Sequence, residues 1–71
     1  MYDARIYIAD KIDRYDAERI LSNHGYRFDW DSGDRLMVNS DSLLEIESLL
    51  INQCITYSII WLIRGLLKYE Q

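Results

Sequence analysis

The alternation of apolar and polar residues predicts four β-strands. Over residues 4–9, Ile6 and Ile8 alternate with Arg5 and Tyr7, which is the period of a strand with one buried face. The same period, with many β-branched and aromatic residues, predicts three further strands at about 26–31, 34–39 and 55–62. The second and third of these four strands are joined by a short polar segment, as in a β-hairpin.

A first helix is predicted between residues 14 and 24. An apolar stripe with helical spacing runs along it, formed by Ala17, Ile20, Leu21 and His24. Asp13 is the expected N-cap residue, and Asp16 follows it near the positive end of the helix dipole. Gly25 occupies the position where a residue in the left-handed region ends a helix.

A second helix is predicted to begin near Ser42. Ser42 and Glu45 have the spacing of a capping box, although Ser40 or Asp41 could cap the helix instead. The inner stripe of this helix would be formed by Leu43, Ile46, Leu50 and Cys54. Cys54 is therefore expected to be an unreactive thiol in the core.

The predicted order of elements is β-α-β-β-α-β in one α+β domain that covers residues 1–71. Such an order favours a ferredoxin-like fold, in which two helices cover one face of a four-stranded antiparallel sheet. Right-handed crossovers would place the third strand between the first two and the fourth beside the first. The alternative is that residues 42–69 form one or two helices and no fourth strand.

Charge and composition limit the classes of function. The 71 residues carry a formal net charge of −4, with a pI near 4.7, so direct nucleic-acid binding is not expected and a partner with a basic surface is favoured. The chain begins without an apolar signal segment, and Arg64 interrupts its longest apolar run. We expect a cytoplasmic protein that does not enter a membrane.

No cofactor, metal or catalytic site is expected. The aspartates around Gly33 resemble a calcium-binding loop only in part, because Gly33 stands at the fifth ligand position and Ser40 at the twelfth. His24 and Cys54 are the only histidine and cysteine, which makes a zinc site improbable. Neither a nucleophile–base pair nor a glycine-rich phosphate loop is visible, so the chain is not expected to be an enzyme.

Six aspartates are the candidate partner-binding residues. In the predicted topology the loop after the first strand and the tip of the hairpin lie at the same end of the sheet. This end would collect Asp10, Asp13, Asp16, Asp29, Asp31 and Asp34. Their simplest roles are helix caps, solvated charges and a type I turn over residues 31–34. The functional alternative is an acidic rim that docks on a basic groove.

These observations favour a small acidic, non-catalytic protein-interaction module. We expect a phage or mobile-element regulator or inhibitor that occupies a basic surface of a host nuclease or defence complex, where its carboxylates replace nucleic-acid charge. The alternative is a small-ligand-binding regulatory domain that acts as a homodimer.

The fourth strand also predicts self-association. Strict alternation would direct Ile59 and Trp61 toward the helices and leave Ile60 and Leu62 on the opposite face. The apolar residues near 65–67 could cover that face, or a second subunit could do so. We expect a homodimer whose interface includes Ile60, Trp61 and Leu62.

Overall fold

The computed structural model describes residues 2–62. Along the chain it contains β1 (Ala4–Tyr7), α1 (Lys11–Asn23), β2 (Asp29–Asp31), β3 (Arg35–Val38), the short 3₁₀ helix η1 (Ser40–Ser42), α2 (Leu43–Asn52) and β4 (Ser58–Leu62). The predicted α+β class and order of elements are confirmed. The alternative of continuous helix over residues 42–69 is wrong, because β4 is a strand.

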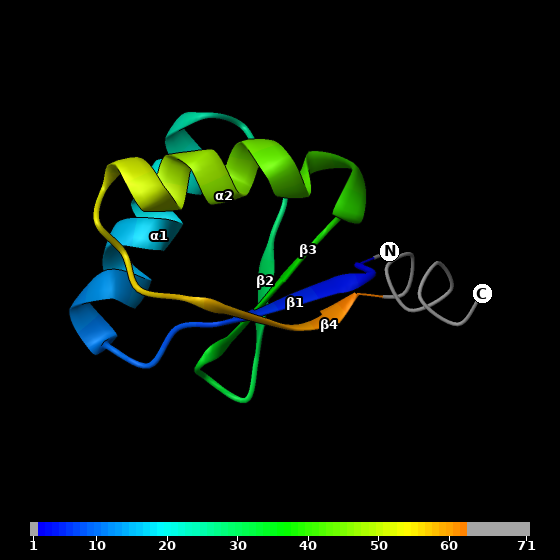
Figure 1. Cartoon of the computed structure of the whole chain (residues 1–71), viewed down its shortest axis with the longest axis horizontal. Helices are drawn as coiled ribbons and strands as arrows, with labels where there is room; N and C mark the ends of the chain where they lie inside the picture. The colour runs from blue at the N-terminus through cyan, green and yellow to red at the C-terminus, as the bar shows by residue number, and fades with distance from the viewer. Residues whose placement is uncertain (1, 63–71) are drawn as a thin grey trace.

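The four strands form one open antiparallel sheet in the order β2-β3-β1-β4. The predicted neighbours are therefore confirmed: β3 lies between β1 and β2, and β4 lies beside β1. Figure 1 shows α1 and α2 on the same side of this sheet, so the molecule has one helical layer and one sheet layer. Among residues 2–62, no helix lies over the second face of the sheet.

The core lies between the helices and the covered face of the sheet. β1 contributes Ala4 and Ile6, and β3 contributes Leu36 and Val38, with all four side chains fully buried. The helices contribute Ala17, Ile20, Leu21, Leu43, Ile46 and Leu50. These residues are the predicted apolar stripes of the two helices, except for the last predicted member of each stripe, His24 and Cys54. Each large buried side chain contributes about 1.5–3 kcal/mol through removal of apolar surface from water.

Helix α1 begins three residues earlier than predicted, because Asp10 and not Asp13 is its N-cap. The Asp10 Oδ1 atom accepts hydrogen bonds from the backbone N–H groups of Ile12, at 2.7 Å, and Asp13, at 3.2 Å. Asp13 instead lies in the first helical turn, where a negative charge is also favourable. The apolar stripe starts only at Ala17 and so carried no signal for the first turn.

The predicted capping box of α2 is not formed. Ser42 precedes the helix but makes no side-chain capping hydrogen bond. Instead, the carboxylate of Asp3 accepts one hydrogen bond from the Ser40 backbone N–H and one from its hydroxyl group, both at 2.7 Å. The start of the second helical segment is thus attached to the residue before β1, which lies 37 positions earlier in the chain.

Both helices end with the same backbone motif. After α1, Gly25 has φ +76°, as predicted, and the Tyr26 N–H bonds to the Leu21 carbonyl at 3.0 Å. After α2, Cys54 has φ +58°, and the Ile55 N–H bonds to the carbonyl of residue 50 at 3.0 Å. These are the bonds of a Schellman motif. The prediction that Cys54 is a core thiol is wrong, because α2 ends at Asn52 and Cys54 is exposed.

The hairpin turn differs from the predicted type I geometry. Ser32 has φ +65° and Gly33 has φ +83°, whereas both central residues of a type I turn have negative φ. Positive values at both positions belong to the mirror-image type I′ turn, whose twist matches that of the two adjoining strands. The positive φ predicted for Gly33 is confirmed. Ser32 also has positive φ because the type I′ turn that joins the paired strands β2 and β3 requires it at both central residues.

The register between β1 and β4 shifts by one residue within the strand. Ile59 pairs with Ile6, but Trp61 pairs with Arg5, so Ile60 is an additional residue between the two pairs. The prediction of uninterrupted alternation along β4 is therefore wrong. A β-bulge of this kind cannot be recognised from the alternation of β-branched residues, because every residue from 59 to 63 is apolar.

Substitution of Cys54 by glycine is expected to increase stability by about 0.5–1 kcal/mol, because glycine adopts positive φ without the steric cost that a Cβ atom imposes. The reverse change at the equivalent position of α1, Gly25→Ala, should decrease stability by a similar amount. Urea denaturation followed by circular dichroism measures both.

Cys54→Ala is the matched control, since it removes the thiol and keeps the Cβ atom. If Cys54→Ala were as stabilising as Cys54→Gly, the backbone explanation would be incorrect.

Candidate functional site

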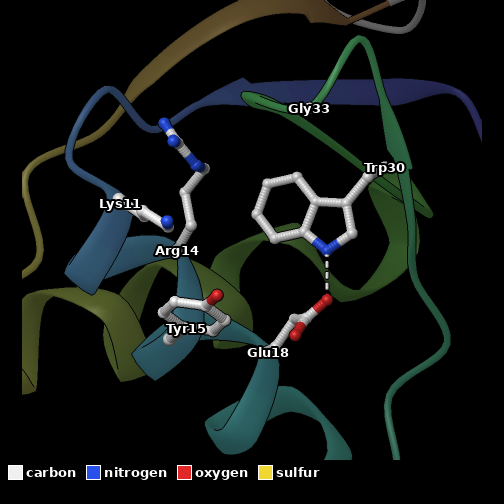
Figure 2. Close-up of a pocket in the computed structure, with 6 residues that line it drawn as sticks. All are labelled: Lys11, Arg14, Tyr15, Glu18, Trp30 and Gly33. Atoms are coloured by element: carbon white, nitrogen blue, oxygen red, sulfur yellow. Dashed lines mark hydrogen bonds between the residues drawn. The ribbon is translucent and has the colours of Figure 1, made fainter.

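Two hollows lie near the start of α1. The first, here called the acidic hollow, has a volume of about 300 Å³ and is lined by Tyr7, Ala9, Asp10, Asp13, Thr56, Tyr57 and Ser58. The second, here called the tryptophan pocket, has a volume of about 380 Å³ and is lined by Lys11, Arg14, Tyr15, Glu18, Trp30 and Gly33. Figure 2 shows the tryptophan pocket.

Two carboxylates of the acidic hollow are positioned by backbone hydrogen bonds. Asp10 caps α1 through Oδ1. Asp13 accepts a hydrogen bond from the Thr56 backbone N–H through Oδ2, at 3.4 Å, which links the first turn of α1 to the segment before β4. In the part of the chain that the structure describes, neither carboxylate is paired with a cation, and each has a second oxygen that accepts no hydrogen bond.

Tyr57 forms the wall of the acidic hollow that lies nearest to α2. Its hydroxyl group donates a hydrogen bond of 2.7 Å to Oε1 of Glu47. This bond raises the pKa of Tyr57 to about 12, with smaller contributions from burial and from the negative charge of Glu47. The half-buried ring packs against the core and is therefore held in one orientation.

The six predicted partner-binding aspartates do not all line one hollow. Asp10 and Asp13 share the acidic hollow. The backbone carbonyl of Asp34 accepts a hydrogen bond from the Ile8 N–H at 3.0 Å, so the hairpin turn does lie at the same end of the sheet as the loop after β1. The other members of the set lie elsewhere.

Two of these aspartates are neutralised by arginines. Asp31 forms an ion pair with Arg5 at 3.3 Å, and Asp16 forms one with Arg19 at 3.0 Å on the surface of α1. Asp29 is exposed at the start of β2, two positions farther from the turn than Asp31. The structure therefore brings Asp10 and Asp13 into one hollow, keeps Asp34 at the same end of the sheet, and pairs Asp16 and Asp31 with arginines.

The tryptophan pocket was not predicted from the sequence. A hydrogen bond of 2.6 Å from Trp30 Nε1 to Glu18 Oε2 links β2 to α1, and Figure 2 shows the two side chains pointing toward each other. Arg14 is held on the β1–α1 segment, where its Nη1 atom donates to the carbonyls of Ile8, at 2.9 Å, and Ala9, at 2.7 Å. One sequence signal existed: the four α1 residues of the pocket have the helical spacing i, i+3, i+4, i+7.

Other residues with possible chemistry do not assemble into a reactive site. Among residues 2–62, no group of three or more histidine, cysteine, aspartate or glutamate residues is arranged to hold a metal ion. His24 is exposed at the end of α1, with Nδ1 lying 2.9 Å from the Ile20 carbonyl oxygen. Over the same residues, no helix combines the length and the apolar character needed to cross a membrane.

Comparisons of the chain with models of protein families, with curated proteins and with solved structures found no match.

Glu47→Gln is expected to lower the pKa of Tyr57 from about 12 toward the ordinary value of 10.0, because an uncharged amide is a weaker hydrogen-bond acceptor than the carboxylate and carries no negative charge. In the wild type the raised pKa stabilises the fold at pH values below 10.0, and this contribution is lost as the pH rises toward 12. The pH dependence of unfolding in this window should be weaker in the variant.

A pH titration of ¹³C-labelled tyrosine by NMR measures the pKa directly. Tyr57→Phe identifies the resonance. An unchanged Tyr57 titration in Glu47→Gln would contradict the assignment of the shift to the Glu47 carboxylate.

Proposed function

We propose that the chain is a non-catalytic protein-interaction module that receives a lysine or arginine side chain of a partner protein in the acidic hollow. The observation that supports this most directly is the pair of carboxylates of Asp10 and Asp13, each with one oxygen that accepts no hydrogen bond from the described residues. Both are attached to the backbone through their other oxygen, so little side-chain entropy is lost when a cation binds.

The walls of the hollow suit a long cationic side chain. Tyr7 and Tyr57 present aromatic surface beside the two carboxylates. An aliphatic stem can pack on such rings while its charged end reaches the carboxylate oxygens, and a cation over a ring face is attracted by the ring quadrupole. The hollow thus combines apolar contact with charge pairing, and aromatic and arginine side chains are both enriched in protein interfaces.

The net charge of −4 adds a long-range contribution. It increases the rate of encounter with a basic partner surface and repels acidic partners. We propose further that the fold is ferredoxin-like, which the strand order and the size of the chain support.

We also propose that the chain is encoded by a phage or mobile element and that its partner is a host nuclease or defence complex, whose basic groove it occupies. The charge and the size of the chain support this second proposal.

The double substitution Asp10→Asn and Asp13→Asn tests the hollow without removing its hydrogen bonds. Asparagine caps a helix as well as aspartate does, and its carbonyl oxygen can still accept the Thr56 N–H. We expect at least a ten-fold loss of a partner captured from lysate of the source cells, and capture by the wild type should decrease at high salt.

The matched control carries Asp29→Asn and Glu45→Gln, which remove the same two charges at exposed positions outside the hollow. Equal losses in both double variants would show that net charge alone attracts the partner. No loss in either would disprove the proposal.

We also propose that the chain forms a homodimer. β4 lies at an edge of the sheet, where its outer backbone groups can pair with a second strand, and Ile60 is 45% exposed. The proposed interface includes Ile60, Trp61 and Leu62.

Ile60→Asp with Leu62→Asp is expected to give a monomer in sedimentation equilibrium, because it places two charges in an apolar interface. Ile51→Asp, at an exposed position of α2, is the control and should remain dimeric. A wild-type chain that sediments as a monomer at high micromolar concentration would exclude the dimer.

A further inference from the structure

We propose that the tryptophan pocket binds a small molecule that carries one carboxylate on a flat aromatic ring. This site and the acidic hollow share no lining residue. The proposal is therefore independent of the interaction with a basic partner.

The pocket has the opposite charge to the chain as a whole. It contains two cations, Lys11 and Arg14, and one carboxylate, Glu18, which gives a local charge of 2 − 1 = +1. The whole chain has 8 basic and 12 acidic residues. The residues at the start of α1 divide by charge: Asp10 and Asp13 line the acidic hollow, whereas Lys11 and Arg14 line the tryptophan pocket. Of these two hollows, the tryptophan pocket is therefore the one that attracts an anion.

Arg14 is prepared to bind a carboxylate. Its Nη1 atom is held by the carbonyl oxygens of Ile8 and Ala9, which fixes the plane of the guanidinium. Within the described residues, no hydrogen bond is made by its Nε and Nη2 atoms, and no ion pair is made by Arg14 or Lys11. The Nε and Nη2 N–H groups form one edge of the guanidinium, which matches the two oxygens of a carboxylate.

The aromatic part of the ligand would lie between Trp30 and Tyr15. The indole of Trp30 is half-buried against the core and is fixed by its hydrogen bond to Glu18, so one ring face is presented to the pocket in a constant orientation. Tyr15 comes from the adjoining turn of α1 and is 62% exposed. Figure 2 shows both rings bordering the space beside Lys11 and Arg14. Ring–ring packing would remove this exposed aromatic surface from water.

Size and charge together limit the ligand. A volume of about 380 Å³ lies at the lower end of the range for small-molecule sites. Glu18 contributes a fixed negative charge at the far end of the pocket, so a polyphosphate or a second acidic group on the ligand would be repelled. A single carboxylate near the start of α1 and an uncharged ring near Trp30 satisfy both limits.

The test uses 2-naphthoate as the probe and the indole N–H resonance of Trp30 as the readout. Trp30→Phe identifies this resonance, because the chain has a second tryptophan, Trp61. In ¹H–¹⁵N spectra of the wild-type chain we expect a saturable shift of the Trp30 resonance at millimolar 2-naphthoate. The neutral analogue 2-naphthalenemethanol should bind several-fold more weakly, because it lacks the carboxylate.

Lys11→Gln is the test variant, because Lys11 is exposed and makes no hydrogen bond or ion pair within residues 2–62 whose loss would unfold the chain. It should weaken 2-naphthoate binding about two- to five-fold, as expected for loss of one exposed charge pair. Arg27→Gln makes the same change in net charge at an exposed position outside the pocket and should leave the affinity unchanged.

Three results would each overturn the proposal: no saturable shift of the Trp30 resonance, equal binding of the neutral analogue, or an equal loss of affinity in Arg27→Gln. Folding of each variant is verified by the dispersion of the same spectra.

Discussion

The pairing of β1 with two neighbours is the interaction on which the rest of the structure depends. β1 is bonded to β3 on one side and to β4 on the other, so it joins the beginning, the middle and the later part of the chain. Its buried residues, Ala4 and Ile6, lie beneath the helices. Because only residues 8–10 connect the end of β1 to α1, the place where β1 ends also positions the start of α1, whose residues line both hollows.

Local patterns were sufficient to predict the kinds of elements and their neighbours. Alternation identified strands, helical spacing identified the buried stripes, and the handedness of crossovers placed β3 between β1 and β2. These patterns did not identify any specific side-chain contact or shift of strand register between residues that are distant in the chain. The bond from Asp3 to Ser40 replaced a plausible local cap, and the bulge in β4 is defined only by its pairing with β1. These errors are errors of long-range geometry.

The candidate sites show the same limit. The sequence identified the acidic character of one end of the sheet, and two of the proposed aspartates, Asp10 and Asp13, do share a hollow. The arginines that neutralise Asp16 and Asp31 were not assigned to them, and in the second case the two residues are 26 positions apart. Prediction of the tryptophan pocket would likewise have required knowledge of a contact between residues that are distant in the chain. A polar stripe on α1 was visible, but only the fold places Trp30 across from it.

The β1–α1 segment lines the acidic hollow through Ala9 and Asp10, and it is also bonded to Arg14, a residue of the tryptophan pocket. Arg14 holds the carbonyls of Ile8 and Ala9, and Asp10 and Asp13 line the acidic hollow. If an occupant of the tryptophan pocket drew Arg14 away from those carbonyls, thermodynamic linkage would also change the free energy of binding at the acidic hollow. Such coupling would be reciprocal, whereas a ligand bound only through the Nε and Nη2 edge of Arg14 would leave the carbonyl contacts and the acidic hollow unchanged.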